Sequence, residues 1–466
     1  METTSAIATN HQAVSDAERL EALRDFNVLG QKTHHPIDIL RFNTCGSVDD
    51  GKSTLIGRLL YDSKSLMEDQ LEALQRSADI TGEGQINLAN LTDGLRAERE
   101  QGITIDVAYR YFATPRRKFI IADTPGHVQY TRNMVTGAST ANLSIVLVDA
   151  RAGVIEQSRR HTYLASLLRI PHLVVAVNKM DLVDWNEERF LQIRDQFEEF
   201  LPRLGIKDVK FIPLCALLGD NVVELSKNMP WYQGPTLLGH LETVHIASDF
   251  NLNGFRFPVQ RVNRPKTPTD TALHDFRGCS GQIAGGIVKP GQRIMVLPSG
   301  LKTTVKEIWT YDGTKAEAFC PQSVTLVLAD DIDVSRGDML VGLDMLPGMA
   351  TEFTARICWM HSRPLQGGRR YLLKQTTQTV QALVNLESRI NIETFEPESD
   401  ATELPMNGVG QVKLQTSRSV IFDGYSTNRL TGSFILIEPG TNATVAAGML
   451  LPPAETVKLE YNDFVI

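Results

Sequence analysis

Residues 41–62 read RFNTCGSVDDGKSTLIGRLLYD and contain the pattern G-x-x-x-x-G-K-S between Gly46 and Ser53. The glycines allow successive backbone N–H groups to point inward and hold phosphate oxygens, and a helix starting near Lys52 adds the partial positive charge of its N-terminal end. The Lys52 ammonium would reach the β- and γ-phosphates of a nucleotide, and the Ser53 hydroxyl would bind Mg²⁺. The chance of such a match arising somewhere in this chain is roughly one in a hundred. The predicted phosphate-binding residues are Gly46, Ser47, Val48, Asp49, Asp50, Gly51, Lys52, Ser53 and Thr54.

Strand and helix signals alternate around this stretch, from about residue 38 to about residue 245. The apolar runs Leu143–Val148 and Leu173–Val177 are too continuous for strands with one solvent-exposed face. They suit strands of a parallel sheet that is covered on both faces. This βαβα order predicts an α/β domain with a doubly wound sheet. The expected strands are Ile39–Thr44, Phe119–Ala122, Leu143–Val148, Leu173–Val177 and Phe211–Leu214, and the expected helices include Lys52–Leu60 and Glu156–Leu168.

Beyond about residue 250 the pattern changes. Helical periodicity fades, and short β-branched runs alternate with glycine and proline turns, as in VKPGQRIMVLPSG (288–300) and TGSFILIEPG (431–440). Such runs are typical of antiparallel barrels, and the remaining length suffices for two of them. We therefore predict an α/β P-loop domain followed by two antiparallel β-barrel domains. The predicted division is a polar N-terminal extension at 1–35, a nucleotide-binding domain at 36–248, barrel II at 249–350 and barrel III at 351–466.

Composition excludes several classes of protein. A chain of 466 residues that is 42% hydrophobic and 22% charged is an ordinary globular chain of about three domains. Its net charge of -8 argues against bulk electrostatic binding to nucleic acid or anionic lipid. No run approaches the ~18 apolar residues of a membrane helix, and the N-terminus lacks the features of a secretory signal. Five widely spaced cysteines without a CxxC pair argue against a disulfide framework or a zinc site. We therefore expect a cytoplasmic protein without a membrane partner.

A second motif, Asp123-Thr124-Pro125-Gly126-His127, directly follows an apolar strand. An aspartate at this position can hold Mg²⁺ through water. Glycine at 126 allows its N–H to approach a γ-phosphate, because no Cβ obstructs it. Alone, Asp-Thr-Pro-Gly is more often a simple turn. Together with the loop at 46–53, it predicts the second half of a phosphate and metal site.

A third motif, Asn178-Lys179-Met180-Asp181, closes the strand Leu173–Val177. Guanine presents N1–H and N2–H₂ as neighbouring donors, and one carboxylate can accept from both, so Asp181 would select GTP over ATP. A weaker element, Cys215-Ala216-Leu217, follows the last strand, and its backbone could meet the guanine O6.

Thr104, in the stretch AEREQGITID, is a candidate for binding Mg²⁺ and the γ-phosphate in a segment that is released on hydrolysis. An ordinary strand start is the simpler interpretation of Thr104 taken alone. The predicted metal ligands are Ser53, Thr104 and Asp123.

These five elements, in this order and at these separations, resemble those of the translation-factor GTPases. Within that group, the sequence most resembles one family, the GTPase subunits (subunit 1) of the two-subunit bacterial sulfate adenylyltransferases. The resemblance covers about 36–455 and is carried by residues 41–62, by DGLRAEREQGITIDVAYRYF (93–112), by FIIADTPGHVQYTRNMVTGAST (119–140), by MPWYQGPTLL (229–238) and by RFPVQRVNRP (256–265).

The resemblance implies a function. In that family the partner, subunit 2, makes adenosine 5′-phosphosulfate and pyrophosphate from ATP and sulfate, a step of sulfate assimilation and cysteine biosynthesis. This subunit binds and hydrolyses GTP, which drives the reaction. His127 falls at the position that orients the attacking water.

The chain departs from the family pattern at two positions. Position 215 is Cys where relatives usually have Ser, which we expect to matter little because the contact is with backbone. Position 128 is Val where the family pattern DTPGHEQY has Glu. Some relatives carry a fused adenylylsulfate kinase, and we expect none here because no second P-loop follows.

Two other classes share these elements. An elongation factor that delivers aminoacyl-tRNA has the same layout, but Asp50 argues against it, since elongation factors usually have His there. A plain signalling GTPase would leave the two barrels without a purpose. The first predicted barrel is locally basic, with nine basic and three acidic residues between 255 and 310. This excess of positive charge indicates either a solvated face or a contact surface for the partner subunit.

Overall fold

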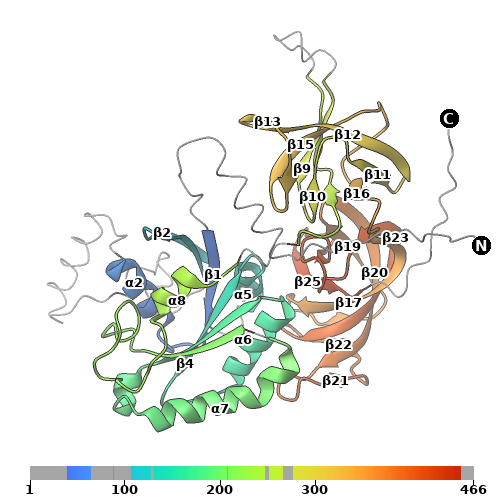
Figure 1. Cartoon of the computed structure of the whole chain (residues 1–466). Coiled ribbons are helices and arrows are strands. Elements are labelled where there is room, and N and C mark those ends of the chain that lie inside the picture. Colours follow the sequence, from blue (N-terminus) through green and yellow to red (C-terminus); the bar gives the residue numbers. More distant parts are fainter. Residues whose placement is uncertain are drawn as a thin grey trace, which may run out of the picture.

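The computed structural model describes residues 39–63, 88, 106–126, 131–206, 208–246, 251–265 and 276–452. Its N-terminal part is built on a six-stranded sheet in the order β2-β3-β1-β4-β5-β6, and only β2 runs antiparallel to its neighbour (Figure 1). All seven residues of β4 are buried, as expected for a parallel strand covered on both faces. The strands are β1 (Ile39–Cys45), β2 (Ala108–Ala113), β3 (Lys118–Asp123), β4 (Leu143–Asp149), β5 (His172–Asn178) and β6 (Asp208–Pro213).

Helices cover both faces of this sheet, which confirms the doubly wound α/β prediction. Apolar side chains of α2 and α8 pack on one face, and those of α5, α6 and α7 pack on the other. None of the helices in the described ranges is long and apolar enough to cross a membrane. The bounds are α2 (Lys52–Asp62), α5 (Thr131–Ala138), α6 (Glu156–Leu167), the 3₁₀ helix η3 (Met180–Val183), α7 (Glu187–Leu204) and α8 (Leu237–Thr243).

The next part of the chain forms an antiparallel half-barrel, barrel II, around its own apolar core (Figure 1). Its main sheet has the order β7-β16-β11-β12-β15-β9-β8, with β13 beside β12, and β10 pairs separately with β14. Its strands are β7 (Arg256–Pro258), β8 (Arg261–Asn263), β9 (Gly278–Gln282), β10 (Ile287–Val288), β11 (Arg293–Leu297), β12 (Leu301–Thr310), β13 (Gly313–Lys315), β14 (Ala318–Phe319), β15 (Ser323–Leu328) and β16 (Met339–Gly342).

The last described part forms barrel III, which is closed because β19 pairs with both β24 and β20. A closed barrel removes the exposed strand edges that promote aggregation. The predicted fold, an α/β domain followed by two antiparallel barrels, is confirmed, and the exact domain boundaries stay a prediction. The strands are β17 (Gly348–Trp359), β18 (Leu365–Gln366), β19 (Arg369–Gln375), β20 (Gln378–Ile390), β21 (Pro397–Glu398), β22 (Glu403–Leu404), β23 (Val409–Phe422), β24 (Ser433–Ile437) and β25 (Thr444–Leu450).

Barrel III packs directly on the α/β domain, where α6 faces β17 (Figure 1). The Tyr163 ring on α6 stacks on Phe395, with ring centroids 5.4 Å apart. The Tyr425 hydroxyl donates to the Leu168 carbonyl, just past the end of α6, at 3.0 Å. The Arg429 guanidinium donates to the Ser139 carbonyl, just past the end of α5, at 2.9 Å. The ends of two helices of the α/β domain are therefore fixed by one loop of barrel III.

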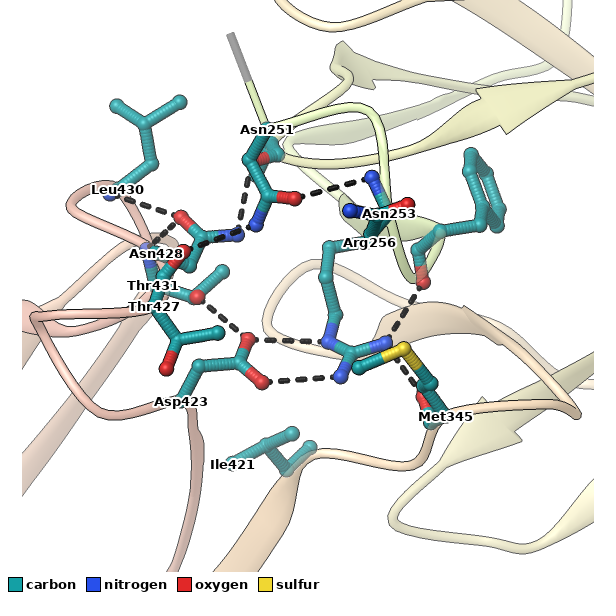
Figure 2. Close-up of polar contacts among 12 residues, drawn as sticks. Asn251, Asn253, Arg256, Met345, Ile421, Asp423, Thr427, Asn428, Leu430 and Thr431 are labelled. Atoms are coloured by element: carbon teal, nitrogen blue, oxygen red, sulfur yellow. Dashed lines mark hydrogen bonds and ion pairs between the residues drawn. The ribbon is translucent and has the colours of Figure 1, made fainter. Parts of the chain in front are cut away.

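The same loop joins the two barrels through a buried ion pair (Figure 2). Arg256 of β7 donates to both carboxylate oxygens of Asp423, at 3.0 and 2.9 Å, and its side chain is 4% exposed. The guanidinium also donates to the Met345 carbonyl at 2.7 Å, and the Asn428 amide donates to the Ala284 carbonyl at 2.9 Å. Arg256, counted among the nine basic residues at 255–310, is thus a barrel–barrel contact and is not available to a partner.

Replacing Asp423 with alanine is expected to destabilise the protein by about 3–5 kcal/mol, because it leaves the buried Arg256 charge without its carboxylate. The free energy of unfolding in urea measures this. The control is Arg363→Ala, which removes the exposed partner of Glu438 in the same barrel, and a surface pair of this kind contributes about 0–1 kcal/mol. Equal losses for the two variants would contradict the prediction.

Candidate nucleotide site

The loop between β1 and α2 has the shape that its sequence predicts. Asp50 closes it from within, because its carboxylate accepts from the Ser47 N–H at 2.5 Å. Gly51 adopts φ 90°, a left-handed conformation that favours glycine, and a Cβ there would lie 2.4 Å from the Asn178 amide nitrogen. A side chain at 51 would therefore disturb both the loop and its neighbour.

Lys52, the first residue of α2, folds back over this loop. Its Nζ donates to the Gly46 carbonyl at 3.1 Å and to the Ser47 carbonyl at 2.7 Å. Burial lowers the pKa of Lys52, while the nearby carboxylates of Asp123 and Asp50 oppose that shift. A buried ammonium with only partial compensation favours an added anion, which is the chemistry of a phosphate site.

The end of β3 lies against the same lysine. The Thr44 hydroxyl donates to the Asp123 carboxylate at 3.4 Å, and the Thr124 hydroxyl donates to the Thr44 carbonyl at 2.5 Å. A Cβ on Gly126 would lie 2.4 Å from Lys52 Nζ, so only glycine fits beside the ammonium. The structure thus brings the first two sequence motifs together, as parallel strands β1 and β3 that end side by side.

The same edge offers hard oxygen donors. Asp123 is 1% exposed at the end of β3, and Ser53 lies in the first turn of α2. A carboxylate and a hydroxyl beside a phosphate loop are the donors that Mg²⁺ takes when it is shared with a nucleotide. The predicted third ligand, Thr104, and the predicted catalytic residue, His127, lie outside the described residues.

Asn178, at the end of β5, joins the phosphate loop to the predicted base-binding segments. Its amide donates to the Asp50 carbonyl at 2.7 Å, and its carbonyl oxygen accepts from the Ala216 N–H at 2.9 Å. Met180 is fully buried in the core. Asp181 follows in the first turn of η3. Asn178 and Met180 therefore place Asp181, the predicted guanine-reading residue, by packing and hydrogen bonding.

The side chain of Cys215 also makes hydrogen bonds in the predicted base-binding segment. Its thiol donates to the Asp181 carboxylate at 3.0 Å, and its sulfur accepts from the Leu218 N–H. Burial, followed by the hydrogen bond to Asp181, raises the pKa of Cys215 to about 12, so the thiol stays protonated and remains a donor. The sequence interpretation gave this segment a backbone role only, and it missed a side chain that orients the predicted base-reading carboxylate.

Three further residues support the site without belonging to any motif. Arg58 of α2 donates to the Ala216 and Leu217 carbonyls, which fixes the segment that is predicted to contact the base. Asp149, at the end of β4, accepts from Lys179 at 3.0 Å and also pairs with Arg151. Gln157 of α6 donates to the Gly126 carbonyl at 2.9 Å. Only Asp149 carried a signal in the sequence, since it ends a strand at the same edge of the sheet.

Comparisons with known proteins agree with this architecture. A family model described as the elongation factor Tu GTP binding domain matches residues 37–235, and one described as the GTP-eEF1A C-terminal domain-like family matches residues 352–451. The solved structure of sup35 complexed with GDP aligns with 92% of this chain and 98% of that one, at 23% identity and a TM-score of 0.40.

Curated relatives are much more similar. The "Bifunctional enzyme CysN/CysC" of Mycobacterium tuberculosis is 56% identical over 89% of this chain and 67% of its own length. The "Sulfate adenylyltransferase subunit 1" of Bacteroides fragilis is 54% identical over 91% of this chain and 88% of that protein. The protein of the same name from Alteromonas mediterranea is 51% identical over 96% of both chains.

Fold and site together define a GTP-binding protein of the elongation-factor type, with one α/β domain and two barrels. Within that class, the chain belongs to the sulfate adenylyltransferase subunit 1 family.

Replacing Asp181 with asparagine is expected to weaken GTP binding at least tenfold and to favour xanthosine triphosphate. Xanthine has a carbonyl where guanine has N2–H₂, so an amide donor becomes the better match. Titration with both nucleotides measures the change. The matched control is Asp184→Asn, an exposed aspartate three residues further on. Unchanged GTP affinity in the Asp181 variant would remove the base-reading role.

Proposed function

We propose that this chain is the GTP-hydrolysing subunit of a sulfate adenylyltransferase, acting with a separate subunit that transfers the adenylyl group. The observation that carries the proposal is the pair of hydrogen bonds made by Asn178, which join the predicted phosphate loop to the predicted base-reading segment. Relatives named as subunit 1 of that enzyme align with nearly the whole chain, and they support the assignment to a sulfate adenylyltransferase with a separate partner subunit.

In this proposal the chain's own residues divide the work as follows. Backbone N–H groups of residues 46–53 and the Lys52 ammonium bind the phosphates, and Gly126 allows the γ-phosphate to approach the end of β3. Asp181 accepts from the guanine ring, while the Cys215 thiol orients that carboxylate. Ser53, Asp123 and Thr104 are the proposed Mg²⁺ ligands. When bound, that ion supplies charge that offsets the phosphates.

The wider setting is also part of the proposal. The partner would be the adenylyl-transferring subunit 2, which uses ATP and sulfate, and the pair would work in the cytoplasm. Hydrolysis of GTP would drive the formation of adenosine 5′-phosphosulfate. The alternative of an aminoacyl-tRNA carrier draws no support from the two relatives that are named sulfate adenylyltransferase subunit 1, one of which aligns with this chain over 96% of both.

His127→Ala is expected to leave GTP affinity within about twofold and to slow hydrolysis by about 10²–10⁴, since the imidazole is assigned to the attacking water and not to the bound nucleotide. Nucleotide titration and phosphate release measure the two quantities. His361→Ala, a histidine in barrel III, serves as the control. A parallel fall in affinity and rate would point to a structural role for His127.

The decisive experiment uses the full chain co-expressed with its adenylyltransferase partner. We expect the isolated chain to form no adenosine 5′-phosphosulfate, because the one predicted P-loop is assigned to a guanine nucleotide. With the partner, GTP is expected to raise the final product level, and phosphate released from GTP is expected to match product formed. An allosteric activator changes only the rate. Equal final product with a non-hydrolysable GTP analogue would therefore refute energetic coupling.

A further inference from the structure

We propose that Asp149 is a positioning residue for guanine-nucleotide binding, which holds the side chain of Lys179, two residues before the predicted base-reading Asp181. This inference rests on the proposed GTPase function and adds a residue that none of the sequence motifs contains. Its basis is the ion pair between the Lys179 ammonium and the Asp149 carboxylate, 3.0 Å long, in which the side chains are 22% and 9% exposed.

The parallel sheet brings the two residues of this ion pair together. Strands β4 and β5 run side by side, and their register aligns Asp149 with Asn178. The Ala150 N–H donates to the Asn178 carbonyl at 2.9 Å, which extends the pairing past the last residue of β4. Lys179 is the next residue along the chain, so its ammonium reaches only to the neighbouring strand. The ion pair is therefore set by the sheet and is not a meeting of two mobile surface groups.

The backbone of Lys179 has an unusual conformation. Its φ of 63° and ψ of 38° are left-handed, a region that few residues other than glycine, asparagine and aspartate adopt readily. This turn directs the chain from β5 into η3, where Asp181 lies. Such a conformation persists only where the surrounding structure determines it. With its backbone set by the turn and its ammonium by Asp149, the long lysine side chain is fixed at both ends.

Asp149 is itself held as an anion by its neighbours. Arg151 donates to its carboxylate three times, from the main-chain N–H at 2.9 Å, from Nε at 3.1 Å and from Nη2 at 2.6 Å. Burial opposes ionisation, but the hydrogen bonds from Arg151 and Lys179 outweigh it and hold the pKa of Asp149 well below its usual range. Arg189 of α7 donates to the Ala150 and Arg151 carbonyls, at 2.7 and 2.9 Å, and fixes the backbone that carries this group.

The ion pair lies close to both parts of the predicted nucleotide site. In the phosphate loop, burial raises the pKa of Asp50, and the charges of Asp149 and Lys179 then act on it in opposite directions. On the base side, Lys179 and Asp181 share one short turn. A free lysine side chain loses rotamer freedom when a ligand orders it, whereas one that is already ordered loses little. Holding Lys179 in advance therefore favours nucleotide binding.

The test is a double-mutant cycle in the full chain with its partner subunit, using Asp149→Asn, Lys179→Met and the two together. Asparagine has the size of aspartate but no charge, so it no longer holds the ammonium. We expect Asp149→Asn to weaken GDP binding by about tenfold, the order of effect of releasing one long side chain. The kcat for GTP hydrolysis is expected to stay within about twofold of the wild type. Nucleotide titration and phosphate release measure the two quantities.

The combined variant separates positioning from a loss of structure. If Asp149 acts through Lys179, the double variant binds GDP as Lys179→Met does, within about twofold, because the lysine that Asp149 holds is already gone. A disturbed end of β4 would weaken binding equally with and without the lysine, so the two losses would multiply. The matched control for the lost charge is Asp195→Asn on α7, an exposed aspartate that pairs with Arg194 at 2.8 Å.

A second substitution keeps the test decisive. Asp149→Ser still offers an acceptor to the Arg151 N–H, and it goes through the same cycle if the asparagine variant does not fold. Wild-type GDP affinity without the Asp149 carboxylate, multiplied losses in the double variant, or a parallel fall in kcat would overturn the positioning role and leave the GTPase function intact. A wild-type complex that binds neither GDP nor GTP would overturn the proposed function, and the positioning role with it.

Discussion

The side-chain amide of Asn178 is the interaction on which the candidate site depends. It donates to the predicted phosphate loop through the Asp50 carbonyl and accepts from the predicted base-binding segment through the Ala216 N–H. The geometry works because β5 and β1 are parallel strands of one sheet, so their carboxyl ends meet at the same edge. An amide suits this position, since it can donate and accept at once without placing a charge beside Lys52.

The packing of barrel III gives the α/β domain a second set of constraints. A single loop, from Asp423 to Thr431, contacts the ends of α5 and α6 and also holds barrel II through Arg256. Polar contacts of this kind require accurate geometry, because a buried charge or amide that loses its partner is costly. The three parts of the protein therefore share one buried polar network. Among the described residues, the α/β domain contacts barrel III through this loop, through α6 and through Phe200 of α7, whose ring lies 5.9 Å from that of Phe395.

Cys215 stands where Ser was expected in the predicted base-binding segment, and its thiol can take over the role of a hydroxyl. A serine and a cysteine are close in size, and each can donate one hydrogen bond. Burial keeps the Cys215 thiol protonated, so it acts toward Asp181 as a hydroxyl would. All five cysteines are buried and free, and in apolar surroundings such thiols behave as small hydrophobic residues with a weak donor.

The sequence by itself determined the α/β fold, the two barrels and the local motifs. Each of these is written in contiguous residues: the glycines of the loop at 46–51, the continuous apolar run of β4, the short strands after residue 250. Hydrophobic periodicity and backbone freedom act over a few neighbouring positions, so they can be read without a structure. The motif that contains Gly126 is local in the same way, but the lack of room for a Cβ at Gly126 comes from Lys52 and the Gly46 carbonyl, which only folding brings beside it.

Only the tertiary structure decided which distant side chains complete the site. Arg58 and Gln157 act on segments 159 and 31 positions away, and nothing local distinguishes them from an exposed arginine or a helical glutamine. The segment that contains Cys215 was predicted, but the bond from its thiol to Asp181, 34 positions away, was not. The same holds for Arg256, which composition placed on a basic surface and packing buried against Asp423. The physical reason is that a hydrogen bond or ion pair depends on distance in space, which the chain sets only when sheet, helices and barrels have packed together.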